Sequence, residues 1–206
     1  MKKLLCSLFV VGALVGCQEQ IDMSDRYVFT QETISGYLQN HADYSEYTAI
    51  LQQVPVSILS KSTVGQLLSA RGHYTCFAPT NEAIHAYLDS LVAKQLIASP
   101  SWEAFTDSVM LDSIRQVIVM NSIIDGGNVT TYQSSEFPLQ GGEFQLANMK
   151  DNKLSIVRAD DPDSVFVNGD ALVDLRNRDI LCSNGVIHQV HTVVAPSDIS
   201  MGQMLQ

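Results

Sequence analysis

The stretch that most constrains the fold covers residues 184–196 and reads Asn-Gly-Val-Ile-His-Gln-Val-His-Thr-Val-Val-Ala-Pro. Its Asn184-Gly185 dipeptide favours positive φ and predicts a tight turn that leads into a strand. Apolar residues then alternate onto both faces, so we expect a strand that is covered on both sides, inside the domain. Pro196 lacks the N–H that a sheet ladder requires, and it should end the strand.

The first sixteen residues have the character of a secretory signal. Lys2 and Lys3 precede an apolar run that is shorter than the ~20 residues needed to span a bilayer. The sequence Leu-Val-Gly-Cys at residues 14–17 resembles a bacterial lipobox, in which the cysteine after the cleavage site carries lipid. We therefore expect Cys17 to be the lipidated residue, with an ordinary signal peptide and an incidental cysteine as the alternative.

The charge of the chain restricts its partners. The sequence has 12 basic and 22 acidic residues and a formal charge of −10, which becomes −12 once Lys2 and Lys3 leave with the signal. Such a charge argues against nucleic acids and anionic membrane faces as partners, because both would be repelled. An acidic balance is also common in soluble secreted domains, so it does not identify a function.

Two cysteines remain after Cys6 is removed and Cys17 is lipidated. They are Cys76 and Cys182. An exported chain permits a disulfide between them, but two buried thiols fit the sequence equally well. We favour buried thiols, because Cys76 stands in a predicted strand where an apolar residue would serve.

Hydrophobic periodicity divides the chain into helices followed by strands. Helical spacing covers residues 33–38, 44–51, 64–68, 82–93 and 108–124, with Thr80 or Asn81 as the N-cap of the fourth helix. Strand patterns cover residues 73–78, 129–132, 143–149, 153–158, 164–167, 171–175 and the final strand. This order predicts an α+β fold in a single domain. Residues 1–16 would be the signal, 17–32 a lipidated tether, 33–198 the folded domain and 199–206 a C-terminal tail.

Two boxes of sequence resemble the fasciclin domain. Residues 74–84 read Tyr-Thr-Cys-Phe-Ala-Pro-Thr-Asn-Glu-Ala-Ile, similar to the first box of that family, and residues 184–191 read Asn-Gly-Val-Ile-His-Gln-Val-His, similar to the second. The resemblance implies N-terminal helices packed on a wedge-shaped β-sandwich of short strands. We expect structural roles for the residues that carry it: Phe77, Pro79, Thr80, Asn81, Asn184, Gly185 and His188.

The resemblance also implies a function. It implies adhesion or protein–protein or protein–glycan contacts, with no turnover. Together with the signal and the lipobox, it leads us to expect a lipid-anchored extracytoplasmic binding module, for which we expect no cofactor. The partner would be an extracellular or outer-membrane protein or a glycan, and the lipid anchor would be the sole membrane contact. The alternative is an accessory lipoprotein of an outer-membrane glycan or nutrient-uptake complex. The expected location is the cell surface of a Gram-negative outer membrane, with its periplasmic face as the alternative.

Two segments bear on the binding site that the resemblance implies. Asn121-Ser122 stand where the family usually has a Tyr-His pair, which weakens any transfer of the adhesive role of that pair. Residues 177–181 read Asn-Arg-Asp-Ile-Leu, similar to a segment implicated in integrin binding in animal relatives, so Asp179 and Ile180 are candidate partner-binding residues. We favour the other interpretation, in which Asp179 closes a turn and Ile180 enters the core.

Patterns for catalysis and metal binding are weak. The histidines lack zinc-site spacing, and the acids near Asn168-Gly169 lack the alternation of a calcium loop, so we expect no metal. Cys76 with His188 is conceivable as a nucleophile and base, but no neighbour of Cys76 would lower its pKa. Asp-Ser followed by an apolar residue resembles a bacterial O-glycosylation tripeptide and makes Ser108 and Ser164 candidates, with helix capping as the alternative.

Overall fold

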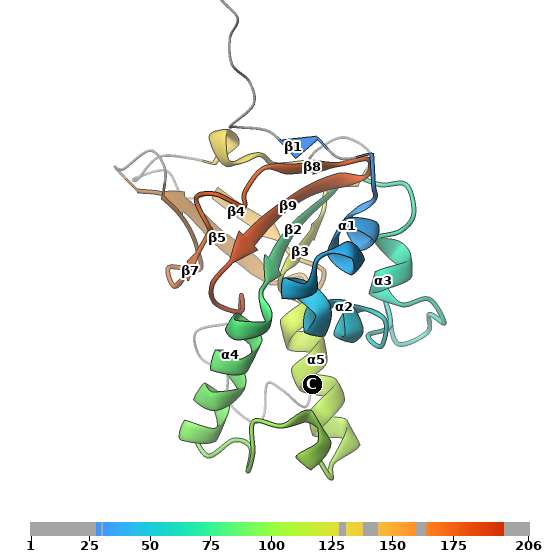
Figure 1. Ribbon diagram of the computed structural model, residues 1–206, viewed down its shortest axis with the longest axis vertical. Helices are drawn as coiled ribbons and strands as arrows, with labels where there is room; N and C mark the ends of the chain where they lie inside the picture. Colours follow the sequence, from blue (N-terminus) through green and yellow to red (C-terminus); the bar gives the residue numbers. More distant parts are fainter. Residues whose placement is uncertain (1–27, 30, 128–130, 138–143, 160–163, 196–206) are drawn as a thin grey trace, which may run out of the picture.

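The computed structural model describes residues 28–29, 31–127, 131–137, 144–159 and 164–195 (Figure 1). Its helices are α1 (Ile34–Asn40), η1 (Ala42–Tyr44), α2 (Ser45–Leu51), α3 (Val64–Leu67), α4 (Asn81–Ala93), η2 (Trp102–Ala104), α5 (Ser108–Met120) and η3 (Ser134–Glu136). Its strands are β1 (Val28–Phe29), β2 (Tyr74–Pro79), β3 (Ile123–Asp125), β4 (Phe144–Ala147), β5 (Lys153–Arg158), β6 (Val165–Val167), β7 (Ala171–Leu172), β8 (Ile180–Cys182) and β9 (Gly185–Val190).

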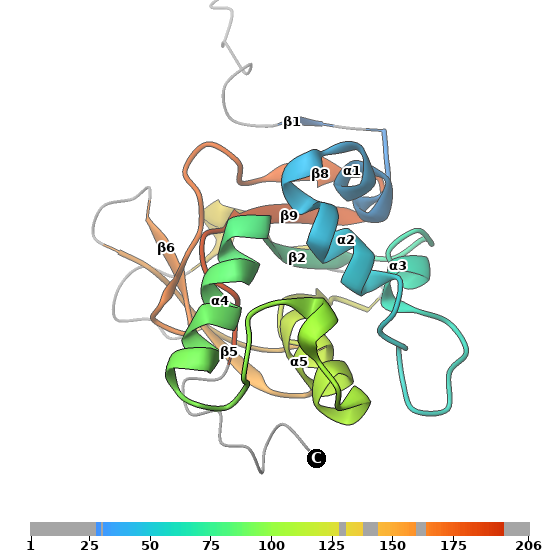
Figure 2. The same cartoon turned by 60° about the horizontal axis from the view of Figure 1, so that its bottom comes forward.

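The strands form two sheets. One has the order β1-β8-β9-β2-β3 and the other the order β4-β5-β6-β7. In the first sheet β9 pairs in parallel with β2 and antiparallel with β8. Helices cover one face of this sheet (Figures 1 and 2), and the second sheet packs against the other face. The predicted α+β class is confirmed.

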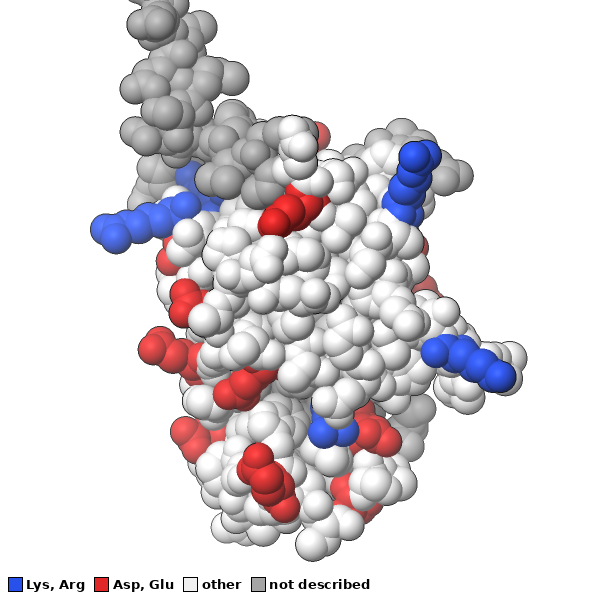
Figure 3. All heavy atoms as spheres, turned by 45° about the vertical axis from the view of Figure 1, so that its right-hand side comes forward, with Lys and Arg blue, Asp and Glu red and all other residues white. Residues whose placement is uncertain are grey.

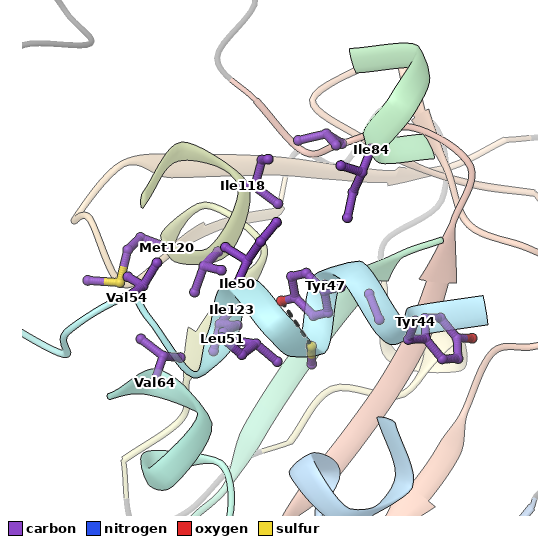
Figure 4. Packing of buried hydrophobic residues seen from close by; sticks show 14 of the residues in the cluster. Tyr44, Tyr47, Ile50, Leu51, Val54, Val64, Ile84, Ile118, Met120 and Ile123 are labelled. Atoms are coloured by element: carbon purple, nitrogen blue, oxygen red, sulfur yellow. Dashed lines mark hydrogen bonds between the residues drawn. The ribbon is translucent and has the colours of Figure 1, made fainter. Parts of the chain in front are cut away.

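Side chains alternate along β2 and β9 between two hydrophobic cores. Cys76 and Ile187 belong to the core beneath the helices, whereas Phe77 and Val190 belong to the core between the sheets. Every residue of both strands is buried, as the apolar residues on both faces of residues 186–193 predict. Figure 4 shows Tyr47 of α2 entering the helical core, where its hydroxyl is 2.6 Å from Ser122 Oγ and 3.6 Å from Cys76 Sγ.

Local caps fix where the helices begin. The Thr63 hydroxyl accepts from Gln66 N at the start of α3, and the Gln66 side chain bonds back to Thr63 N in a capping box. Thr80 caps α4 by accepting from Ala83 N at 3.2 Å. Each oxygen satisfies an N–H that the first helical turn leaves without a partner.

Three elements differ from the sequence-based expectations. The helix predicted for residues 108–124 ends at Met120, because Ile123 and Ile124 pair with the edge of β2 as β3 and enter opposite cores. Val28–Phe29, expected in an irregular tether, pair in parallel with β8. Ile180–Cys182 form β8 rather than only following a turn.

The strand predicted for residues 129–132 lies partly outside the described residues, and residues 131–132 are irregular.

The turn into β9 is closed by the Asn184 side chain. Its Nδ2 donates to Leu68 O at 2.7 Å and to Ala70 O at 2.8 Å, and its Oδ1 accepts from Ile34 N at 2.8 Å. Asn184 therefore joins the start of β9 to the first turn of α1 and to the segment that follows α3. These are buried hydrogen bonds between segments far apart in the sequence, so the residue organises the fold.

Gly185 is required for close approach, not for positive φ. Neither Asn184 nor Gly185 has a positive φ, so that prediction is wrong, and the turn between β8 and β9 consists of Ser183 and Asn184. A Cβ on Gly185 would lie 2.1 Å from the carbonyl oxygen of Tyr74, which pairs with it in the parallel ladder. A side chain here would have to push β2 away from β9.

We predict that Gly185→Ala lowers the free energy of unfolding by about 3 kcal/mol, at the upper end of overpacking effects, because the opposing atom is backbone in a paired strand. The matched control is Gly36→Ala in α1, where the nearest atoms to an added Cβ are at 3.4 and 3.6 Å. It should change stability by less than ~1 kcal/mol, since alanine favours helix. Urea unfolding of both variants measures the difference, and equal effects would contradict the proposed steric cause.

Candidate partner-binding surface

His188 is completely buried and neutral, and it has the structural role that we expected. Asp179 N donates to its Nδ1 at 3.3 Å, which assigns the proton to Nε2, and Nε2 donates to Tyr132 O at 2.8 Å. The ring stacks on Phe77 with centroids 5.5 Å apart. Burial lowers the pKa of His188, and the Asp179 carboxylate opposes that shift only in part. The residue therefore serves as a hydrogen-bonded core group.

Asp179 and Ile180, the candidate partner-binding residues, both lie inside the domain. Asp179 has a positive φ of 56° and is 6% exposed, and Ile180 belongs to the helical core. The Asp179 carboxylate accepts from Ser134 N at 2.6 Å and from the Ser134 hydroxyl. These contacts agree with the turn-and-core interpretation, because neither side chain is presented to a partner in this fold.

Cys76 and His188 do not form a catalytic pair. In the parallel ladder Cys76 is opposite Ile187 and Phe77 is opposite His188, so Cys76 and His188 face different sides of the sheet. Burial raises the pKa of the Cys76 thiol to about 12, which keeps it protonated at neutral pH. Cys76 and Cys182 are both buried and are not joined in a disulfide.

Asn121-Ser122 build an internal polar network at the end of α5. Asn121 Oδ1 accepts from Asn148 Nδ2 at 2.9 Å and from Asn152 Nδ2 at 3.1 Å. Ser122 Oγ donates to Val119 O at 2.9 Å and bonds to the buried Tyr47 hydroxyl. Both residues of the pair are buried, so they connect α5 to its neighbours rather than contact a ligand.

The outer ends of the two boxes meet at a polar cleft of about 330 Å³. Gln189 accepts from Tyr44 OH at 2.7 Å, and His191 Nε2 is 2.7 Å from Asp174 Oδ2. Partial burial pushes the pKa of Asp174 upward, but two backbone N–H groups and the His191 ring outweigh it, and the net shift is downward. The cleft is lined by Asp43, Thr80, Asn81, Glu82, Gln189 and His191.

Asn81 connects this cleft to α2 rather than capping α4. Its Oδ1 accepts from Glu46 N at 3.0 Å, and its Nδ2 donates to Ala42 O and to Ser45 Oγ, both at 3.0 Å. Of the two alternatives for the N-cap, Thr80 is therefore correct. Because Asn81 fixes the Glu46 backbone, the first box also positions the carboxylate that projects from α2.

Glu46 lies beside an aromatic cluster that we call the Trp102 surface, defined by Glu46, His85, Trp102, Phe105 and Arg115. Trp102 Nε1 donates to Glu46 Oε2 at 3.2 Å, and His85 Nε2 bonds to Glu46 Oε1. The Arg115 guanidinium lies over the indole, 5.9 Å from its centroid, and the Phe105 ring stacks beside it at 6.1 Å. The half-buried indole is thus held in one position by its neighbours.

A shallow cavity of about 200 Å³ adjoins the Trp102 surface, since Phe105 lines it together with Leu96, Ile97 and Met110. Tryptophan and arginine are the residues most enriched among the energetic centres of protein interfaces. No motif in the sequence singles out Trp102. The one available signal was that it is the single tryptophan of the chain.

A model of the fasciclin domain family matches residues 52–196. The chain belongs to the fasciclin domain family. Human periostin is 27% identical to it over 193 residues, which are 93% of this chain and 19% of periostin, so the chain spans about a fifth of that relative. The solved structure of a FAS1 domain pair from the insect cell adhesion molecule fasciclin I matches with a TM-score of 0.54 at 17% identity. That match covers 80% of this chain and 51% of the other, and it shows the fold.

Family membership and fold are therefore as predicted, and fasciclin domains are adhesion-related extracellular modules. Within the described part of this domain, no group of three or more His, Cys, Asp or Glu side chains could hold a metal ion. Three of the acids considered above for a calcium loop, Asp160, Asp161 and Asp163, lie outside the described residues, as does Cys17. No helix among the residues described is long and apolar enough to cross a membrane.

The candidate glycosylation residues differ in accessibility. Ser108 is exposed at the first position of α5, and the preceding Asp107 caps that helix by accepting from Val109 N at 2.9 Å. Ser164 is half-buried, and its carbonyl accepts from Ala159 N. The capping role of Asp107 is therefore present, and the exposure of Ser108 keeps it accessible for modification.

We predict that stability falls on acidification because of His188. Its folded-state pKa is lowered from the usual 6.5, so the unfolded chain binds the proton first as the pH drops. The stability gained from keeping His188 neutral is fully present above about pH 6.5 and is lost below it. In that range the free energy of unfolding should fall by at most about 1.4 kcal/mol per pH unit. The measurement is urea unfolding between neutral pH and pH ~5.

His188→Gln should be less stable than the parent but show a shallower pH slope, because the titrating group is gone. His73→Gln is the matched control, since His73 is exposed, and it should keep the slope of the parent. An unchanged slope in His188→Gln would show that the buried imidazole does not govern the acid sensitivity.

Proposed function

We propose that this fasciclin domain is a lipid-anchored adhesion module that contacts a protein partner through the Trp102 surface. The observation that carries the proposal is an indole that is half exposed yet fixed by Glu46, Phe105 and Arg115. An aromatic side chain that is already ordered loses little conformational entropy on binding. Burying it therefore yields more affinity than burying a mobile surface side chain.

The chemistry of the Trp102 surface favours a protein partner. Arg115 lies over one face of the indole, whereas a sugar ring needs a bare aromatic face on which to stack. The adjoining cavity offers an apolar recess for a side chain of the partner. The carboxylate of Glu46 and the ring of His85 provide polar contacts at the edge of the indole.

The anchoring and location rest on the N-terminal sequence. The lipobox-like residues 14–17 support a lipid on Cys17, and the signal character of the preceding residues supports export. We place the domain on the cell surface of a Gram-negative outer membrane.

We also propose a non-enzymatic role. No feature of the described residues calls for turnover, since Cys76 and His188 are buried on opposite sides of one sheet.

The second candidate is an accessory role in an outer-membrane glycan or nutrient-uptake complex. The polar cleft between the boxes favours it, because hydrogen-bonding groups such as Gln189, Asn81 and His191 are the kind that recognise sugar hydroxyls. In this role the cleft, rather than the indole, would carry the ligand. The two candidates therefore predict different sensitive residues.

We predict that Ser108 carries a glycan in the native host. The intact mass of the protein purified from its own cells should exceed lipidated polypeptide by one or more sugar residues. Ser108→Ala should remove that increment, and Ser113→Ala, in the neighbouring Asp-Ser pair, should retain it because the Ser113 hydroxyl donates to Val109 O. A mass equal to polypeptide plus lipid would show that Ser108 acts only in the helix start.

We predict that Trp102→Ala weakens partner capture at least tenfold, the loss typical of a central interface tryptophan. The measurement is brief surface crosslinking of intact cells that express the lipidated protein, followed by pull-down and quantification of the captured proteins. Leu175→Ala removes another exposed apolar side chain, 51% exposed, and should capture as much as the parent. Circular dichroism and thermal unfolding confirm that each variant is folded.

Three results distinguish the candidates. Loss of a matrix or neighbouring-cell protein in Trp102→Ala alone supports adhesion through the Trp102 surface. Capture of a transporter or glycan-binding lipoprotein that is lost in Gln189→Ala, but not in Trp102→Ala, supports the uptake role. Failure of crosslinker and protease to reach the protein on intact cells would place the domain on the periplasmic face and contradict the proposed location.

A further inference from the structure

The loop between α2 and α3 protrudes from the domain on a firm base (Figures 1 and 2). Val56 N donates to Ser62 O and Val64 N to Val54 O, both at 2.9 Å, and an antiparallel bridge joins Pro55 to Thr63. The side chains of Val54 and Val64 are buried in the helical core. The two arms of the loop therefore hold its tip away from the protein surface.

The tip carries two neighbouring aliphatic side chains that contact almost nothing. Ile58 is 99% exposed and Leu59 is 96% exposed. The other large hydrophobic residues that are exposed in the described part of the chain, Val109 and Leu175, reach only 59% and 51%. Single exposed aliphatic residues are common on protein surfaces. An adjacent pair at the end of an ordered loop is different, because only another molecule or a membrane can cover its apolar surface.

Three hydrogen bonds join serines at the two sides of the tip. Ser60 N donates to Ser57 O at 3.0 Å, Ser62 N donates to Ser60 Oγ at 3.0 Å, and Ser60 Oγ donates to Ser62 O at 3.4 Å. Internal bonding of this kind lowers the penalty for moving a turn out of water.

The charge around the loop is opposite to that of the whole chain. Residues 47–81 contain no aspartate or glutamate, although the chain has 22, and they include the exposed Lys61 and Arg71. Figure 3 shows acidic side chains mostly at the left and bottom of this face, and basic side chains at its right edge as well as at its left edge and near its lower centre. The net charge of −12 argued against anionic membrane surfaces for the molecule as a whole, but repulsion beyond about 8–10 Å is screened at physiological salt. The charge of the residues close to the tip, rather than the net charge of the chain, therefore determines whether an anionic surface attracts or repels the tip.

We propose that this tip inserts Ile58 and Leu59 into the interface of a phospholipid bilayer while Lys61 contacts headgroup phosphates. Lys61 follows Leu59 by two residues, so the cation lies at the depth where an apolar tip meets the headgroup layer. The contact is separate from any lipid on Cys17 and goes beyond partner binding. It gives the domain a fixed orientation at the membrane, which a lipid on a tether alone does not provide.

The experiment uses the chain without its predicted signal and with Cys17→Ser, so that no lipid is attached. Binding is measured by flotation with vesicles of phosphatidylcholine and with vesicles of equal parts phosphatidylcholine and phosphatidylglycerol. The double variant Ile58→Ser/Leu59→Ser should lower the partition coefficient at least tenfold on both, because most of the inserted apolar surface is lost. Lys61→Gln should lower it about fivefold on the mixed vesicles and leave the phosphatidylcholine value unchanged.

The matched control is Val109→Ser/Leu175→Ser, which removes two exposed aliphatic side chains from other elements and should stay within about twofold of the parent. Ile58 and Leu59 lie outside both cores, so their variant should unfold at the temperature of the parent. Absence of vesicle binding by the parent, or equal losses in the two double variants, would overturn the proposal. So would a tip variant that keeps vesicle binding but no longer captures a crosslinked protein, because the tip would then be a protein contact.

Discussion

The parallel pairing of β2 with β9 is the contact on which the other layers depend. Six residue pairs, from Tyr74 with Gly185 to Pro79 with Val190, join an early strand to the last one. Both strands are buried along their whole length, so each supplies side chains to the helical core and to the core between the sheets. A parallel ladder between distant segments forms only after a long loop is closed, which costs conformational entropy. The hydrogen bonds of Asn184 offset part of that cost, because they form only once the loop is closed.

This pairing also explains why the groups with the most reactive chemistry are withdrawn from solvent. Cys76, His188 and Asp179 all lie within or beside the central strands, where burial shields them from solvent. His188 is fixed by Asp179 N and Tyr132 O, and Cys76 is kept protonated by the apolar surroundings. The inward-facing residues of the family boxes therefore serve the fold, and the proposed binding features lie at the outer ends of the boxes or where the chain leaves the central sheet.

Local chemistry made much of the fold predictable from sequence. The final strand, the position of the first box and the starts of α3, α4 and α5 follow from apolar alternation and from caps such as Thr63, Thr80 and Asp107. The sequence pattern predicts that Ile123 and Ile124 end a helix, because an Ile-Ile pair satisfies helical spacing as well as strand alternation, and only the free edge of β2 decides between them. The role of Gly185 was misread for the same reason, since the carbonyl it must approach belongs to a residue more than a hundred positions away.

The candidate binding features were the least predictable, because exposure is a tertiary property. Nothing local distinguishes the aliphatic Ile58-Leu59 pair, which remains in solvent, from Ile180, which is buried. Likewise, Trp102 acquires its neighbours from α2 and α5, and neither contact is visible in a loop sequence. Both features lie on segments that contribute little to the central ladder. Substitutions there can change what the domain binds while the β2–β9 pairing keeps the fold, and this separation makes the Trp102 surface and the α2–α3 tip independently testable.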